Sequence, residues 1–206
     1  LVTDMRSERD PTGQKDDAKK SILGQPEKDW LKRELQAASG RYPLIVWIGS
    51  VSWLRYKGTN YYPQPDKGIY GVLNHERLLE AARREWAKGK QPKPPGDEEH
   101  WCAYATERQE LADFIKTNHI QGLCYLHGDA HMLAADDGRN GDFATDGGAP
   151  IPTMCAAPLD QANSIKGGPY SQDVYRVRDN EGCFGLFQVN DLGDRLEVSY
   201  SGRNHK

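Results

Sequence analysis

The sequence has few cysteines and no long hydrophobic run, and each absence excludes a class of protein. Four cysteines occur among 206 residues, and none forms a C-x-x-C pair, so neither a thiolate zinc knuckle nor a thioredoxin-like redox motif is expected. The longest apolar stretches, such as Leu44–Ile48, are far shorter than the roughly 20 residues that a transmembrane helix needs. A signal peptide, an internal repeat and a heptad pattern are also missing.

A large excess of charge is missing too. The formal net charge is −3, which gives no clear signal for nucleic acid or for an anionic membrane. The length suits one domain. The chain opens with Leu1 in place of an initiator Met, so we expect a piece cut from a longer polypeptide. The absence of a targeting segment therefore leaves the cellular location unknown.

Helical patterns recur along the chain. A helix is expected over residues 25–38, where Pro26 occupies the first turn and apolar residues follow at helical spacing. A second is expected over residues 75–87. A third is expected over residues 106–118, because Thr106-Glu-Arg-Gln has the pattern of a capping box.

Extended patterns lie between and after these helices. The segments 44–48 and 122–127 are apolar without alternation, which is typical of buried strands. The last quarter of the chain has short strands separated by turn residues, expected at 151–156, 174–177, 183–189 and 195–200. The order predicts an α/β (α+β) fold, in which helices flank a mixed sheet and an antiparallel meander follows. Residues 54–100 are expected to form an insertion or loop region.

Three potential metal ligands follow the strand over residues 122–127. His127, Asp129 and His131 alternate with Gly128 and Ala130. If the extended conformation continues, the three side chains point the same way. Two imidazoles and a carboxylate within five residues suit Zn, Fe or Mn. The alternative interpretation is a strand-end histidine beside a turn aspartate.

A second group of charged residues lies near the beginning of the chain. Residues 1–3 have the pattern of a strand fragment, and Asp4 and Arg6 follow it in a polar loop. Arg offers a bidentate fork to phosphate, so this pair is a candidate phosphate clamp, with a solvated ion cluster as the alternative. We expect Asp4 and Arg6 at the same rim as Asp129 and His131.

Several motifs, taken in order, resemble the C-terminal half of the catalytic domain of the PhoD-like (alkaline phosphatase D) metallophosphatases. They are the family's Asp-x-Arg-x-x-Arg strand exit, its Trp-Leu helix, its Trp-x-x-Tyr-x-x-Glu-Arg signature, its Gly-Asp-x-His metal motif and its strand before the last hairpins. The matching segments are 1–9, 23–35, 101–108, 128–131 and 154–159. Glu27 stands where the helix motif has Gln, and His127 stands where the family often has Ser.

The resemblance implies a single partial domain over residues 1–206, belonging to a four-layer sandwich with a two-metal site. It implies hydrolysis of phosphate mono- or diesters, with two or more metal ions such as Ca, Fe, Zn or Mn. Asp129 would bind one metal and His131 the other, and Asp4 and Arg6 would bind substrate. Arg6 is also a catalytic candidate through neutralisation of phosphate charge. His127 is a catalytic candidate as the acid for the leaving oxygen, with a supporting or packing role as the alternative.

Most of the family's other metal ligands lie in an N-terminal half that this chain does not include. We therefore expect two partners, the phosphate-ester substrate and the missing N-terminal half of the domain. We expect the isolated chain to be inactive. Two other functions remain open. One is a binding module that kept the fold and lost catalysis. The other is a non-haem iron oxygenase, which also uses two His and a carboxylate, although the alternation of helices and strands does not suggest its small β-barrel.

Overall fold

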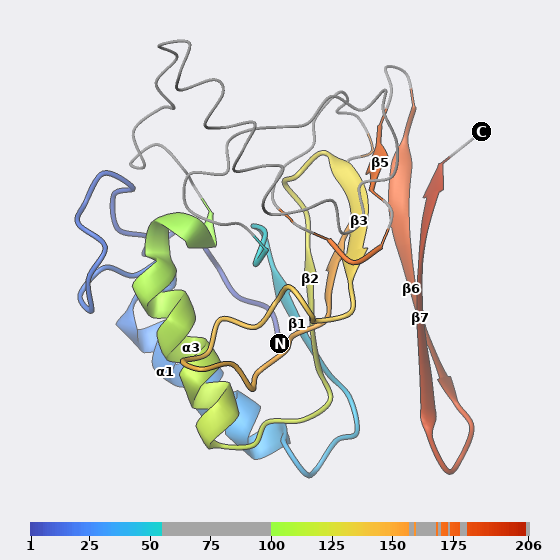
Figure 1. The fold of residues 1–206 in the computed structure, drawn as a ribbon, viewed down its shortest axis with the longest axis horizontal. Helices are drawn as coiled ribbons and strands as arrows, with labels where there is room; N and C mark the ends of the chain where they lie inside the picture. Colours follow the sequence, from blue (N-terminus) through green and yellow to red (C-terminus); the bar gives the residue numbers. More distant parts are fainter. Residues whose placement is uncertain are drawn as a thin grey trace.

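Two helices lie beside a mixed sheet, and a long antiparallel hairpin forms a second sheet (Figure 1). The computed structural model describes residues 1–54, 100–156, 159, 168, 170–172, 174–177 and 181–204. The helix expected at 75–87, and nearly all of the expected insertion at 54–100, lie outside the described residues. No helix in the described part of the chain is long and apolar enough to cross a membrane. The mixed α/β class expected from the sequence is confirmed.

The first helix has the bounds expected from the sequence. Helix α1 (Gln25–Ala38) follows Gly24 and carries its proline in the first turn, where no intrahelical N–H is needed. Leu31 and Leu35, four residues apart on one face, are fully buried. The chain then leaves the helix through Gly40, whose φ of 76° is easily reached only by glycine.

The second helix begins differently from the prediction. A short 3₁₀ helix, η2 (Trp101–Tyr104), leads directly into α3 (Ala105–Thr117), so Tyr104 stands at the N-cap and makes no side-chain cap bond. The predicted capping box at Thr106 is therefore wrong. The backbone N–H groups of Ala105 and Thr106 donate to the Asp16 carboxylate at 3.2 and 3.3 Å. A residue from a distant loop satisfies the helix start.

The mixed sheet has the strand order β1-β2-β4-β3-β5. Neighbours β1, β2 and β4 are parallel, whereas β3 is antiparallel to both β4 and β5. Residue Val2 forms a parallel bridge with Ile48 of β1 and extends the sheet by a strand fragment. The strands are β1 (Ile45–Gly49), β2 (Leu123–His127), β3 (Met132–Asp136), β4 (Thr153–Cys155) and β5 (Tyr175–Arg176).

The chain ends in a hairpin of two nine-residue strands, β6 (Cys183–Asp191) and β7 (Leu196–Asn204). It contacts the mixed sheet at β3, on the side away from the helices (Figure 1). A Cβ at Gly202 would lie 2.7 Å from the Leu133 side chain, so the backbone approaches the sheet closely here. The antiparallel ending is confirmed as this hairpin. The expected third strand, β5, pairs with β3 instead.

An aromatic cluster joins the helical layer to the sheet. Its members are Trp47, Trp53, Trp101 and Tyr125, all fully buried, with ring centroids 4.8–6.0 Å apart and mostly edge-to-face. Such pairs contribute about 0.5–1.5 kcal/mol each beyond the area that they bury. Because Trp101 opens η2, the cluster anchors the start of η2 and α3 against β1 and β2.

Candidate functional site

The parallel strands bring several loops to one edge of the sheet. We define the carboxyl edge as the edge at which β1, β2 and β4 end, where Gly49, His127 and Cys155 lie side by side in register. The bridge from Val2 to Ile48 is also parallel, so the loop that begins at Asp4 leaves the sheet at this edge too. In open sheets with parallel strands, ligands bind outside the carboxyl ends of the strands.

The Gly-Asp-x-His motif forms a tight turn at this edge. Strand β2 ends at His127, and the next strand begins at Met132. Asp129 and His131 have φ values of 60° and 57°, and the Ala130 N–H donates to the Gly128 carbonyl at 2.7 Å. The extended conformation therefore ends at His127, and the condition under which His127, Asp129 and His131 would point the same way is not met. Two left-handed residues reverse the chain so that β3 can pair with β4.

His127 is buried at the carboxyl end of β2. Its Nδ1 lies 2.9 Å from the Gly128 carbonyl oxygen, which can only accept, so Nδ1 carries the proton. Its Nε2 is buried and has no hydrogen-bond partner in the described part of the chain. Burial lowers the pKa of His127 to about 4, against the opposing effects of the Gly128 carbonyl and Asp129. The side chain is therefore neutral near pH 7, with an accepting lone pair at Nε2.

Asp129 faces a residue to which the sequence analysis gave no role. The Nδ1 atom of His100 lies 3.6 Å from the Asp129 Oδ2 atom. The His100 side chain is buried, whereas about a third of the Asp129 side chain (32%) is exposed. His100 directly precedes Trp101, and 28 residues separate it from Asp129 in the sequence. The only sequence signal near His100 was Trp101, the first residue of the Trp-x-x-Tyr-x-x-Glu-Arg signature.

Asp4 shapes the loop that carries Arg6. Its carboxylate accepts hydrogen bonds from the backbone N–H groups of Arg6 and Ser7 and from the Ser7 hydroxyl. These bonds, the hydroxyl first, hold the pKa of Asp4 below its usual value. The side chains of Asp4 and Arg6 are exposed, and the loop that carries them begins at the carboxyl edge. A shared site for Asp4, Arg6, Asp129 and His131 stays a prediction.

The Trp-x-x-Tyr-x-x-Glu-Arg signature has structural contacts throughout. The Tyr104 hydroxyl donates to the Asp10 carbonyl at 2.6 Å, and the Arg108 guanidinium donates to the Trp53 carbonyl at 2.8 Å. The Glu107 carboxylate accepts from Ser21 and from the Ile22 N–H, and burial raises its pKa above the usual value. These buried side chains hold the loops that leave the carboxyl edge.

The donors at the turn have the right chemistry for a metal but are too few for a complete site. Asp129 offers an anionic oxygen, and a neutral histidine offers a nitrogen, which together suit Zn, Fe or Mn. The buried Nε2 of His127 is a further donor without a partner among the described residues. Within residues 1–54, 100–156 and the shorter described stretches, however, no three His, Cys, Asp or Glu side chains converge on one point.

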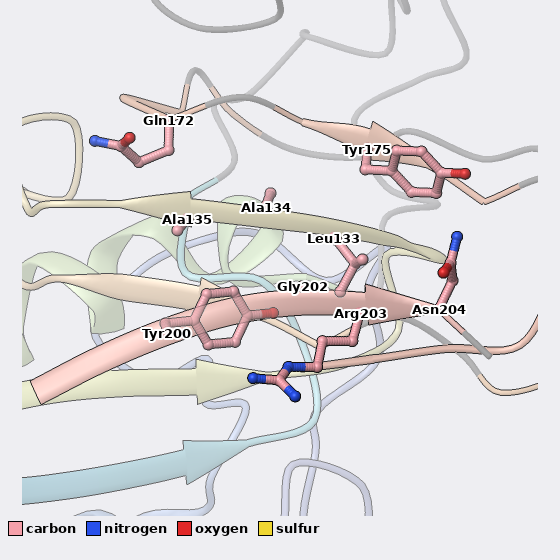
Figure 2. Close-up of a pocket in the computed structure, with 9 residues that line it drawn as sticks. All are labelled: Leu133, Ala134, Ala135, Gln172, Tyr175, Tyr200, Gly202, Arg203 and Asn204. Carbon is pink, nitrogen blue, oxygen red and sulfur yellow. The ribbon is translucent and has the colours of Figure 1, made fainter. Parts of the chain in front are cut away.

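A separate groove of about 610 Å³ lies between the two sheets (Figure 2). Side chains from β3, β5 and β7 line it, including Leu133, Tyr175 and Arg203. Tyr200 also borders it, but its hydroxyl already donates to the Cys155 carbonyl. None of the residues predicted for the site lines this groove. It is therefore distinct from the carboxyl-edge turn.

Comparisons with known proteins give one family match and one structural match. The family model of the PhoD-like phosphatases matches residues 1–181. A solved structure titled "Structure of PhoD" has a TM-score of 0.53 and 14% sequence identity, over 100% of this chain and 41% of that chain. At this identity the likeness shows the fold alone. No curated protein matches the chain.

The family match extends over most of the chain and includes the turn at residues 128–131, the signature at 101–108 and the strand exit at 4–9. The structural match covers the whole chain with the same mixed α/β fold. The resemblance inferred from the motifs is thereby confirmed: the chain belongs to the PhoD-like phosphatase family.

Proposed function

We propose that this chain is part of a metal-dependent phosphatase that hydrolyses phosphate mono- or diesters with two metal ions. The observation that carries the proposal is the Gly-Asp-x-His turn at the carboxyl edge, within a chain of a phosphatase family. The chain spans 41% of the PhoD structure that it matches, so the complete ligand set would include residues beyond this chain. Neither an oxygenase nor a binding module is favoured by any observation at the turn.

Phosphate esters resist hydrolysis because their anionic oxygens repel nucleophiles and an alkoxide leaves poorly. Two bound metal ions would hold the phosphoryl oxygens and lower the pKa of water from 15.7 to about 7. In this proposal, Asp129 supplies an oxygen to one metal and His131 a nitrogen to the other. Both residues lie in the four-residue turn between β2 and β3, where their backbones are left-handed.

The remaining predicted residues act on the substrate. Arg6 would neutralise phosphate charge, and the hydrogen bonds of Asp4 hold the loop from which the guanidinium projects. His127 presents an acceptor at Nε2, because its Nδ1 proton is held by the Gly128 carbonyl. As an acid for the leaving oxygen, His127 would first have to take a proton from the attacking water. The alternative role of His127 is to accept a hydrogen bond that supports the turn.

The test uses the longer protein that contains this chain. Asp129→Ala and His131→Ala should each lower phosphatase activity about tenfold or more, the size expected when metal binding or positioning is damaged. Activity should be measured with a phosphomonoester and a phosphodiester, before and after chelation, and after addition of Zn, Mn, Fe or Ca.

Asp137→Ala is a matched control, because Asp137 is an exposed aspartate just beyond the far end of β3, paired with Arg139. It should retain activity. A protein that is indifferent to chelator and to both turn substitutions would contradict the proposal. A stable protein without hydrolysis of either ester, but with intact metal binding, would favour a binding module.

A further inference from the structure

The His100 and Asp129 side chains lie close together without forming a hydrogen bond with each other. A protonated imidazole beside a carboxylate forms a charge-assisted hydrogen bond of about 2.7–2.9 Å. The observed separation of 3.6 Å between Nδ1 and Oδ2 is too long for a hydrogen bond.

The separation is only slightly larger than the distance between two ligands of one metal ion. A histidine nitrogen at about 2.0–2.1 Å and a carboxylate oxygen at about 2.0–2.2 Å from a tetrahedral metal lie roughly 3.3–3.5 Å apart. The observed 3.6 Å is close to that value. The pair would have to move by only a few tenths of an ångström to chelate an ion.

The backbones on both sides hold the two donors in place. The His100 carbonyl accepts a hydrogen bond from the Ala103 N–H at 3.0 Å, which fixes the start of η2. Trp101, the next residue, packs against Trp47 and Trp53 with centroids 6.0 and 5.2 Å away. Asp129 is aimed by its left-handed turn. A ligand pair set on rigid supports is the arrangement that metal sites need.

We propose that His100 is a metal ligand, binding through Nδ1 the same ion as Asp129. The inference rests on the proposed function, since the remaining ligands would come from beyond this chain. An imidazole nitrogen suits a transition metal such as Zn, Fe or Mn, whereas calcium takes oxygen ligands. The ion held by Asp129 is therefore a transition metal rather than calcium.

The experiment measures metal binding to the longer protein, stripped of metal and titrated with Zn²⁺ or Co²⁺. His100→Phe keeps an aromatic ring but removes the donor, and it should weaken Zn²⁺ and Co²⁺ binding about tenfold to a hundredfold. Binding of Ca²⁺ should change far less. The Co²⁺ absorption spectrum should also change, because a nitrogen ligand is lost.

Two further variants separate the outcomes. His100→Asn offers an amide oxygen near the position of Nδ1 and should recover part of the Zn²⁺ affinity. If His100→Phe does not fold, the comparison of His100→Asn with the wild type takes its place. His119→Phe changes an exposed histidine beyond the end of α3 and should leave binding unchanged.

Asp129→Asn shows which proposal fails. If it weakens Zn²⁺ binding while His100→Phe and His100→Asn bind as the wild type, His100 is not a ligand and the proposed function stands. An equal loss of Zn²⁺ and Ca²⁺ in His100→Phe, with an unchanged Co²⁺ spectrum, would also overturn the inference, because His100 would then only position Asp129. If the wild type binds no metal, the proposed function fails together with the inference.

Discussion

The backbone of the Gly-Asp-x-His turn is strained at the two residues that carry the predicted metal ligands. Left-handed conformation costs roughly 1–2 kcal/mol for a residue with a Cβ, and glycine would avoid that cost. Asp129 and His131 both adopt it. Strain of this kind persists where the surrounding structure enforces it, and it clusters at functional sites. The turn is therefore held tightly by its surroundings, as are His119 and Asp146, which have similar φ values.

This strain predicts an unusual order of stability at Asp129. Asp129→Gly and Asp129→Ala both remove the carboxylate, but only glycine relieves a φ of 60°. The glycine variant should therefore be more stable than the alanine variant by about 1 kcal/mol. Urea unfolding of the two variants measures the difference.

Asp137 provides the comparison for this prediction. Its φ is not in the left-handed region, so the ordinary order should hold, with alanine more stable than glycine by about 0.4–1 kcal/mol. The same order at both positions would show that Asp129 is not strained in solution.

Among the elements, helix α3 depends on distant parts of the chain. The signature residues Tyr104, Glu107 and Arg108 bind the backbone near residues 10, 22 and 53. The sequence motif by itself gives these residues no structural role. The contacts instead explain it by packing: the side chains hold the loops that end at the carboxyl edge.

A prediction at the start of α3 distinguishes the observed bonds to Asp16 from the expected capping box at Thr106. Asp16→Ala removes the acceptor for the Ala105 and Thr106 N–H groups and should cost about 1 kcal/mol of unfolding free energy. Thr106→Ala removes the residue of the expected capping box and should change stability by less than about 0.5 kcal/mol. Thermal and urea unfolding of both variants provide the measurement. A larger loss for Thr106→Ala would restore the capping box.

Local sequence patterns predicted the helices and strands better than they predicted which strands and residues contact each other. The helix over 25–38 was predicted with correct bounds because its proline, apolar spacing and terminal glycine are all local signals. The pairing of β5 with β3 was missed, since register with a strand some 40 residues earlier leaves no local trace. Asp16 at the helix start and His100 beside Asp129 were missed for the same reason. The turn at 128–131 was found by its residue types, but its left-handed backbone was not predicted.

At the scale of the whole molecule, the hairpin has an apolar face that the mixed sheet covers only in part. In the register of β6 and β7, Val189 pairs with Val198, on the same face as Gly202, which touches Leu133. Yet Val189 and Val198 remain 44% and 38% exposed. On the first strand of the mixed sheet, Ile48 is 41% exposed as well. The exposed pair Val189 and Val198 favours association of this face with another surface.

We therefore expect this 206-residue chain, prepared on its own, to self-associate in solution through the inner hairpin face, the face that carries Val189 and Val198. Light scattering after size-exclusion chromatography should show a mass that rises with concentration. The double variant Val189→Lys, Val198→Lys places two charges on that face and should shift the chain towards the monomer. Gln188→Lys with Ser199→Lys is the matched control, because this neighbouring pair lies on the opposite face of the hairpin and carries the same added charge. It should leave the association unchanged, provided that circular dichroism shows both variants folded. A wild-type chain that stays monomeric at all concentrations, or two double variants that act alike, would show that the inner hairpin face does not drive association.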